Sequence, residues 1–136
     1  MPGRRELMKG MALVTGLASL RCDGSPTDPL TPPPPAPRTL HVALMPIGET
    51  VAAFDGADAL AVTRLGPSSV VAVSRTCTHQ GCTVLLPAVA GQTLDCPCHG
   101  SRFATDGTVV NGPAAQPLPS FPARIEAGEV VVTLEG

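Results

Sequence analysis

Two short stretches of the chain combine cysteine with histidine and could bind a metal. CTHQGC covers residues 77–82, and DCPCHGS covers residues 95–101. Each supplies a thiolate and an imidazole, as Cys-x-His in the first and Cys-x-x-His in the second. Structural zinc sites usually take like ligands from one segment, as C-x₂₋₄-C or H-x₃₋₅-H pairs. Unlike ligands paired within each stretch instead favour a dinuclear iron–sulfur cluster, with cysteines on one iron and histidines on the other.

The two stretches together resemble the cluster-binding loops of Rieske iron–sulfur proteins, and both motifs match completely. The resemblance implies one 2Fe-2S cluster as the cofactor. It also implies how the four ligands divide between the irons. Cys77 and Cys96 would bind one iron, and His79 and His99 would bind the outer one.

The same resemblance gives a role to the other two cysteines of these stretches. Cys82 and Cys98 match a disulfide that links the loops in the quinol-oxidising branch of the family. Soluble Rieske ferredoxins and aromatic-ring dioxygenases usually lack this pair. In an exported protein such a disulfide is chemically reasonable, and it would restrict the access of water to the cluster.

Three further positions bear on cluster tuning and docking. By resemblance, the Ser101 hydroxyl donates to a bridging sulfide. Phe103 occupies a position where high-potential members have tyrosine, and phenylalanine cannot donate a hydrogen bond. Gln80 stands where quinol-oxidising proteins often have leucine, so the docking surface is expected to differ. Residues 111–121, NGPAAQPLPSF, resemble the proline-rich third loop that covers the cluster.

Short β-rich runs separated by turn residues surround these loops and must position them. The pattern predicts an all-β fold, and the resemblance makes it a Rieske-type antiparallel β-sandwich with a small cluster-binding subdomain of loops. A closing hairpin is expected over 123–134, with its turn at Ala127-Gly128. The other strands are expected over these ranges: 39–45, 49–54, 59–65, 69–75, 83–86, 92–96 and 101–110.

Composition narrows the function classes. The formal net charge is −2 and charged residues make up 15% of the chain, which argues against a nucleic-acid-binding surface. No carboxylate pair indicates acid–base catalysis, because Asp55, Asp95 and Asp106 fall at expected turns or strand ends. His41 has no cysteine partner nearby and is expected to be an ordinary strand residue.

The first 38 residues are expected to form two segments ahead of the Rieske domain at 39–136. Residues 1–22 resemble a twin-arginine export signal, with Arg4-Arg5 before a short apolar stretch. Two interpretations stay open for Cys22: a lipid-modified cysteine of a lipoprotein, or a free thiol in a discarded signal. Residues 23–38 contain seven prolines and are expected to form an extended linker.

Two functions fit these features. The first is one-electron transfer in an exported, membrane-tethered protein of a quinol:cytochrome c type respiratory chain. The second is the small Rieske subunit of a periplasmic molybdenum enzyme such as an arsenite oxidase. The expected partner is a cytochrome c, a cytochrome b complex or a molybdenum subunit, and the expected location is the periplasm or the outer face of a bacterial inner membrane. Whether the chain counts as an enzyme subunit stays open. A terminal oxygenase is not expected, because it would need an additional domain with a mononuclear iron, and 136 residues leave no room for one.

Overall fold

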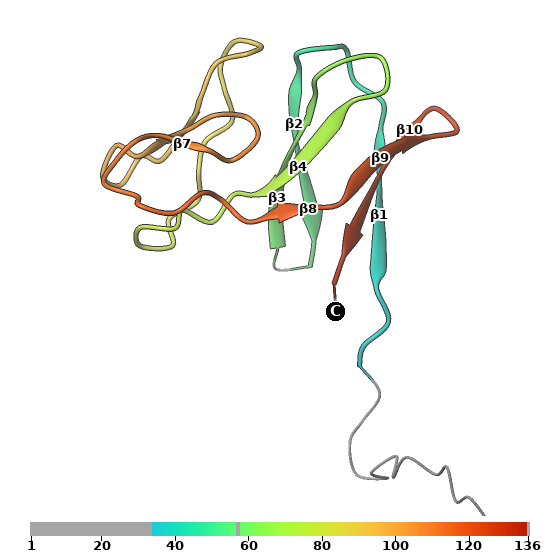
Figure 1. Ribbon diagram of the computed structural model, residues 1–136, viewed down its shortest axis with the longest axis horizontal. Helices are drawn as coiled ribbons and strands as arrows, with labels where there is room; N and C mark the ends of the chain where they lie inside the picture. The colour runs from blue at the N-terminus through green and yellow to red at the C-terminus, as the bar shows by residue number, and fades with distance from the viewer. Residues whose placement is uncertain (1–33, 57, 136) are drawn as a thin grey trace, which may run out of the picture. The chain divides into compact units, whose positions relative to one another are not determined.

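The computed structural model describes residues 34–56 and 58–135, and these residues form β-strands joined by loops (Figure 1). The export signal, Cys22 and most of the proline-rich linker lie outside the described residues. Within them, no helix is long and apolar enough to cross a membrane. The strands are β1 (Arg38–Ala43), β2 (Thr50–Asp55), β3 (Asp58–Arg64), β4 (Val70–Ser74), β5 (Leu94–Asp95), β6 (Arg102–Phe103), β7 (Val109–Asn111), β8 (Ser120–Phe121), β9 (Ala123–Glu126) and β10 (Glu129–Leu134).

Two antiparallel sheets form a sandwich. One has the strand order β1-β10-β9 and the other the order β2-β3-β4-β8. Alternate residues of β3 and β10 point into the space between them, where Leu60, Val62, Val130 and Val132 are fully buried. Burial of each such side chain stabilises the fold by roughly 1.5–3 kcal/mol, which explains how a chain nearly without aromatic residues forms a core.

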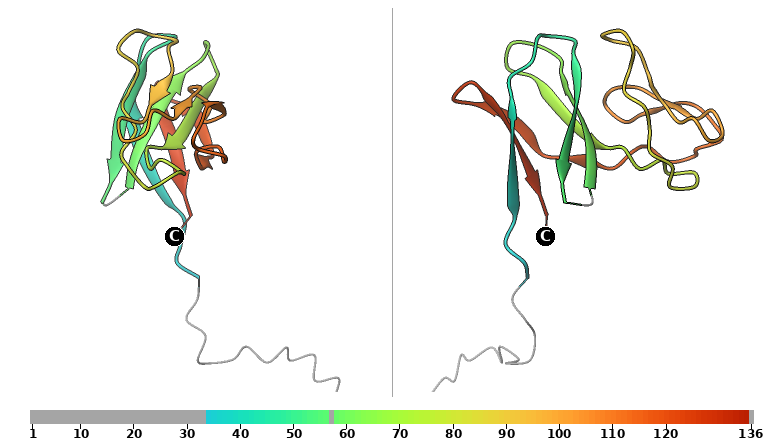
Figure 2. Two further views of the ribbon diagram at one scale, coloured as in Figure 1. Left: turned by 90° about the vertical axis from the view of Figure 1, so that its left-hand side faces the viewer. Right: turned by 180° about the vertical axis from the view of Figure 1, so that it is seen from behind.

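The central strands β3 and β4 are buried on both faces. While Leu60 and Val62 face the sandwich core, Ala61 and Val73 belong to a second apolar cluster with Leu94 and Phe103. Strand alternation therefore joins the sandwich to the region that follows β4. This region, residues 76–119, is called the cluster-binding region below, and Figure 2 shows it at one side of the sandwich.

The predicted closing hairpin is confirmed. Strands β9 and β10 pair antiparallel, with Glu126 opposite Glu129. Ala127 and Gly128 have φ values of 51° and 82°, and positive φ at both central positions is the signature of the hairpin turn expected there.

The expected strand at 83–86 does not form. Thr83 bridges to Thr76, whereas Leu85 bridges to Asp95, so the two alternate residues contact different segments. A strand needs consecutive pairing with one neighbour, which this change of partner prevents. The sequence did not predict β8. This short strand lies between Pro119 and Pro122 and pairs with β4.

Candidate metal centre

The two Cys/His loops have the same backbone hydrogen bonding. In the first, the Gly81 N–H donates to the Cys77 carbonyl over 2.8 Å, and in the second the Gly100 N–H donates to the Cys96 carbonyl over 3.1 Å. Both glycines have positive φ, 78° and 81°, a backbone conformation that is unfavourable for residues other than glycine. Each loop thus turns back immediately after its first cysteine.

The second bond of each loop closes that turn. The Cys77 N–H donates to the Cys82 carbonyl over 2.8 Å, and the Cys96 N–H donates to the Ser101 carbonyl over 2.8 Å. Two loops separated in sequence therefore present their first cysteines in matching ways. Both cysteines are free thiols, and they are only 2% and 3% exposed.

The two predicted histidine ligands lie next to each other although they come from different loops. The ring centroids of His79 and His99 are 4.8 Å apart, and the ring planes are 83° apart. His79 Nδ1 is buried without a hydrogen-bond partner among the described residues. A buried ring nitrogen without a partner is unfavourable, so the arrangement fits a metal at that nitrogen.

The surroundings of Cys77 favour the thiolate that a metal requires. Burial acts to raise the pKa of this thiol. Hydrogen bonds from the backbone of His79 and Gln80, and from the side chains of Cys96 and Ser101, outweigh it and lower the pKa below its ordinary value. A thiolate is the form of cysteine that binds metal.

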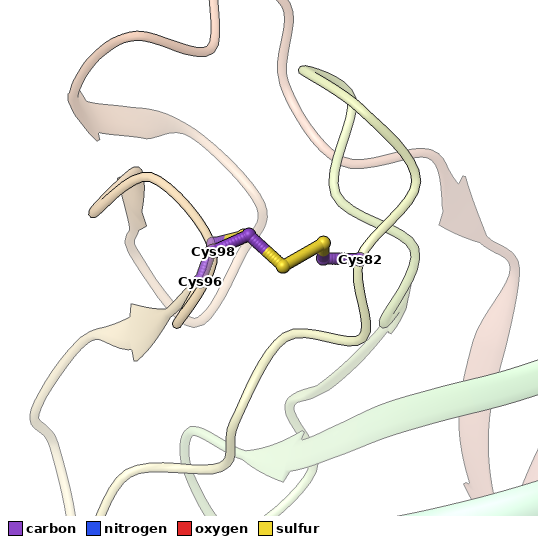
Figure 3. A group of neighbouring side chains, drawn as sticks. All are labelled: Cys82, Cys96 and Cys98. Carbon is purple, nitrogen blue, oxygen red and sulfur yellow. A yellow bond between two sulfur atoms is a disulfide. The ribbon is translucent and has the colours of Figure 1, made fainter.

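The disulfide expected from the resemblance is present and joins the two loops. Cys82 and Cys98 are bonded, with a Cα–Cα distance of 6.4 Å and a sequence separation of 16 (Figure 3). The Cys96 sulfur lies within 4.8 Å of both of these sulfurs. Because Cys82 and Cys98 are bonded to each other, Cys96 alone of the three keeps a free thiol for a metal.

The proline-rich third loop contacts both Cys/His loops. Ser101 is fully buried, and its Oγ accepts a hydrogen bond from the Ala114 N–H over 3.0 Å. The Thr78 hydroxyl donates to the Gln116 carbonyl over 2.6 Å. Thr78 is a positioning residue that the sequence analysis missed. The only feature that marked Thr78 in the sequence was its hydroxyl group, at a position between two predicted ligands.

The other residues named in the sequence analysis either lie away from the two Cys/His loops or have a structural role beside them. Phe103 is fully buried in β6, opposite Leu94. His41 lies in β1, and its Nδ1 is 3.1 Å from Glu129 Oε2. Asp95 ends β5, where it accepts a hydrogen bond from the Thr93 hydroxyl.

Asp55 and Asp106 also occupy the positions expected of them. Asp55 ends β2, with its carboxylate 3.0 Å from the Arg38 guanidinium. Asp106 lies in the turn after β6. Hydrogen bonds from the Thr108 backbone and side chain lower the pKa of this carboxyl. None of these aspartates forms a catalytic carboxylate pair with another.

An all-β sandwich with two matched Cys/His loops and a disulfide between them fits an iron–sulfur protein. Comparison with known families agrees, since the Rieske [2Fe-2S] domain matches residues 38–122. The chain belongs to this family, and its cofactor is therefore a 2Fe-2S cluster. The four-residue ligand set remains a prediction.

Curated relatives include subunits of cytochrome b6-f complexes. The iron–sulfur subunit from Chlorobaculum thiosulfatiphilum is 32% identical over 108 residues, which are 74% of this chain and 59% of that protein. The corresponding subunit from Chlorobaculum tepidum is 41% identical over 66 residues, 48% of this chain and 36% of that protein. The chain thus matches between about a third and three fifths of the length of these relatives.

Solved structures also resemble the described fold. A cyanobacterial plasma membrane Rieske protein from Synechocystis has a TM-score of 0.55 at 33% identity, covering 61% of this chain and 84% of that one. A chain in a complex of oxygenase and ferredoxin of carbazole 1,9a-dioxygenase has a TM-score of 0.58 at 31% identity, covering 71% and 94%. A chain of a hyperthermophilic respiratory Complex III has a TM-score of 0.54 at 26% identity, covering 68% and 71%.

Proposed function

We propose that this protein transfers single electrons through a 2Fe-2S cluster bound by two thiolates and two imidazoles, those of Cys77, Cys96, His79 and His99. The observation that carries the proposal is that the ring centroids of His79 and His99 lie 4.8 Å apart, while His79 Nδ1 is buried and has no hydrogen-bond partner within residues 34–56 and 58–135. The cluster supplies reversible one-electron chemistry when bound. The protein holds it, limits the access of water and leaves one side open to a partner.

Exposure indicates which side is open. Cys77 and Cys96 are buried, His79 is partly buried and His99 is exposed. Electrons are therefore expected to enter and leave on the histidine side, since electron transfer is fastest where the least protein intervenes. The disulfide and the third loop hold the loops together around this side.

We further propose that the protein serves a quinol:cytochrome c type respiratory chain. Two observations support this assignment over a soluble ferredoxin. The first is similarity to cytochrome b6-f iron–sulfur subunits, and the second is the Cys82–Cys98 disulfide, which Rieske ferredoxins usually lack.

The proposal includes export and a tether. Residues 1–22 would be the export signal, residues 23–38 a linker, and residues 39–136 the Rieske domain in the periplasm or at the outer face of a bacterial inner membrane. The pair Arg4-Arg5 and the proline content of the linker support this division. Lipid attachment at Cys22 would supply the tether.

Purification of the full chain from membranes of its native host tests the assignment. Co-purification of b-type haem, together with quinol-dependent reduction of the cluster, is the expected result. Co-purification of molybdenum without b-type haem would instead support the small subunit of a molybdenum enzyme. Replacing Arg4-Arg5 by two lysines should block export, and Cys22→Ser should release the exported protein from membranes; a protein unaffected by both changes would contradict the proposed tether.

A further inference from the structure

The segment that connects the two Cys/His loops changes its pairing partner at Val84. On the N-terminal side, Thr83 bridges to Thr76, the residue before the predicted ligand Cys77. On the C-terminal side, Leu85 bridges to the residue that directly precedes the second predicted ligand cysteine. Val84 is fully buried and belongs to the same apolar cluster as both of these cysteines. Its position therefore links the placement of one predicted ligand to that of the other.

Both backbone groups of Val84 are bonded to Arg75. The Val84 N–H donates to the Arg75 carbonyl over 2.7 Å, and Arg75 Nε donates to the Val84 carbonyl over 2.8 Å. The second bond comes from a side chain rather than from a neighbouring strand, because the pairing partner changes at this residue. The Arg75 guanidinium thus supplies the donor that a buried carbonyl needs.

The backbone of Arg75 is anchored to the sandwich. Arg75 directly follows β4, and its N–H donates to the Ala59 carbonyl of β3 over 2.8 Å. Arg75 also lies two positions before Cys77, a stretch of chain that spans at most about 7 Å. It therefore connects the central strands of the sandwich to the segment between the two Cys/His loops.

The charge of Arg75 differs in its surroundings from that of the other described arginines. Ion pairs with carboxylates, at 2.9–3.4 Å, are formed by Arg38, Arg102 and Arg124. Arg64 donates to three backbone carbonyls. Arg75 is half-buried and forms no ion pair within the described part of the chain. Because a guanidinium is not deprotonated in proteins, it is a fixed positive charge there.

The acids of the cluster-binding region do not cancel this charge. Residues 76–119 contain only three charged residues, Asp95, Arg102 and Asp106. Arg102 Nε lies 3.4 Å from Asp95 Oδ1, so these two largely cancel each other. Asp106 is exposed, and water and salt therefore screen its charge more strongly than that of the half-buried Arg75.

We propose that Arg75 is a positioning residue, which holds the two Cys/His loops in register through Val84 and whose fixed positive charge favours the reduced state of the cluster. This inference rests on the proposed function, because it concerns the cluster that these loops are proposed to hold. Reduction makes the cluster one unit more negative, and a nearby positive charge stabilises the more negative state. Cys77 is only 2% exposed, so water weakens this attraction little on the cysteine side.

Three variants separate the charge of Arg75 from its hydrogen bond. Arg75→Gln removes the positive charge, whereas Arg75→Lys keeps it but loses the planar Nε–H donor. Arg124→Gln is the matched control, because it removes the same charge from an exposed position in β9. The equilibrium of each full-length holoprotein with a redox mediator is measured by potentiometric titration.

The charge role predicts a specific order of the reduction equilibria. Arg75→Gln should lower the equilibrium constant for reduction by about threefold or more, a fall in potential of about 30 mV at about 59 mV per tenfold change. Arg75→Lys and Arg124→Gln should stay within about 1.5-fold of wild type. An unchanged equilibrium in Arg75→Gln would overturn the charge role. An equal fall in Arg75→Gln and Arg75→Lys would also overturn it, because a purely structural effect does not depend on the retained charge.

The positioning role has a readout that does not depend on electron transfer. Release of iron from the oxidised holoprotein to an excess of chelator is followed by the loss of visible absorption. Arg75→Gln should release iron at least about threefold faster than wild type, because an unbonded Val84 carbonyl loosens the segment between the loops. Arg124→Gln should release it at the wild-type rate. Release from Arg75→Gln at the wild-type rate would overturn the positioning role.

The wild-type protein offers a test that does not require a variant to fold. In the oxidised, ¹⁵N-labelled holoprotein, the Arg75 Nε–H should exchange with water at least about tenfold more slowly than the Arg124 Nε–H. The acceptor of Arg75 is a buried carbonyl, whereas Arg124 is exposed and bonds to the exposed Glu126. Equal exchange rates would show that the Arg75 side chain is not held at Val84 and would overturn the inference.

The proposed function and this inference fail in different ways. A holoprotein without a reducible cluster would contradict the proposed function. A cluster that is reduced normally in wild type, but whose reduction equilibrium does not respond to Arg75→Gln, would contradict only the inference about Arg75.

Discussion

The Ala114 N–H donates to Ser101 Oγ over 3.0 Å, and this bond joins the third loop to the second Cys/His loop. Because Ser101 Oγ accepts this bond, the hydroxyl proton stays available for donation to sulfur. We therefore expect two roles for Ser101: it holds Ala114 in place, and its hydroxyl, which helps to lower the pKa of the Cys77 thiol, would donate a hydrogen bond at the cluster site.

Ser101→Ala should remove both roles. Loss of the acceptor leaves the Ala114 N–H without its partner, which should lower the free energy of unfolding by about 1–3 kcal/mol. Loss of the donor should lower the reduction potential by tens of millivolts, since 59 mV for one electron corresponds to about 1.4 kcal/mol. Protein-film voltammetry and urea unfolding measure the two effects. The exposed Ser120→Ala is the control and should change neither; an unchanged potential in Ser101→Ala would contradict the tuning role.

Phe103 should keep the potential below that of relatives with a tyrosine at this position. We expect about +100 to +200 mV near neutral pH for the wild-type protein, in the upper part of the Rieske range. Phe103→Tyr should raise this value by tens of millivolts through a hydrogen bond to the Cys77 sulfur. A wild-type value below zero, or a tyrosine variant that folds without any shift, would refute this explanation.

The ligand assignment predicts a specific spectroscopic loss. His79→Ala or His99→Ala should abolish the low-average-g EPR signal of the reduced cluster, because each removes a nitrogen ligand from the outer iron. His41→Ala is the matched control, because His41 lies in β1 beside Glu129. The EPR signal of this variant should be unchanged. A normal Rieske spectrum in either loop variant would remove that histidine from the ligand set.

Loss of the disulfide should destabilise the holoprotein and lower its potential. The bond closes a loop of 16 positions, so Cys82→Ser or Cys98→Ser should reduce the free energy of unfolding by about 2–4 kcal/mol. Separated loops would also admit water to the cluster and so lower the potential. Denaturant unfolding and voltammetry test both effects. The double serine variant should match the single variants, and a single variant as stable as wild type would contradict the structural role of the bond.

Gly107 should be required for steric as well as conformational reasons. Its φ is +90°, and an added Cβ would lie 3.0 Å from the Leu118 carbonyl oxygen and 3.2 Å from Val73 Cγ1. Gly107→Ala should therefore destabilise the protein by about 1–3 kcal/mol beyond the effect of positive φ alone. Gly91→Ala isolates that conformational effect, because Gly91 has φ +78° and no atom within 4 Å of an added Cβ. Equal destabilisation of the two variants in urea would show that the contact at Val73 is unimportant.

Local sequence patterns predicted much of this structure. The Ala127-Gly128 turn and the flanking alternation predicted the closing hairpin, because positive φ and two-residue periodicity depend on neighbours in the sequence. The turns of the two Cys/His loops are local in the same sense, since Gly81 and Gly100 bond back to cysteines only four positions earlier. The strand expected at 83–86 failed because its residues face two different partners, which local alternation does not record.

The amino-acid sequence by itself determined the family, the candidate ligands and the small number of charged residues in the cluster-binding region. These properties depend on which residues are present and on short spacings. Only the tertiary structure decided that His79 meets His99, that Ser101 holds Ala114, and that Thr78 holds Gln116. The partners in these pairs are 13 or more positions apart. They come together because β3 and β4 bury one face against the sandwich core and the other against the cluster-binding region, so packing of both faces, rather than local preference, sets where the loops lie.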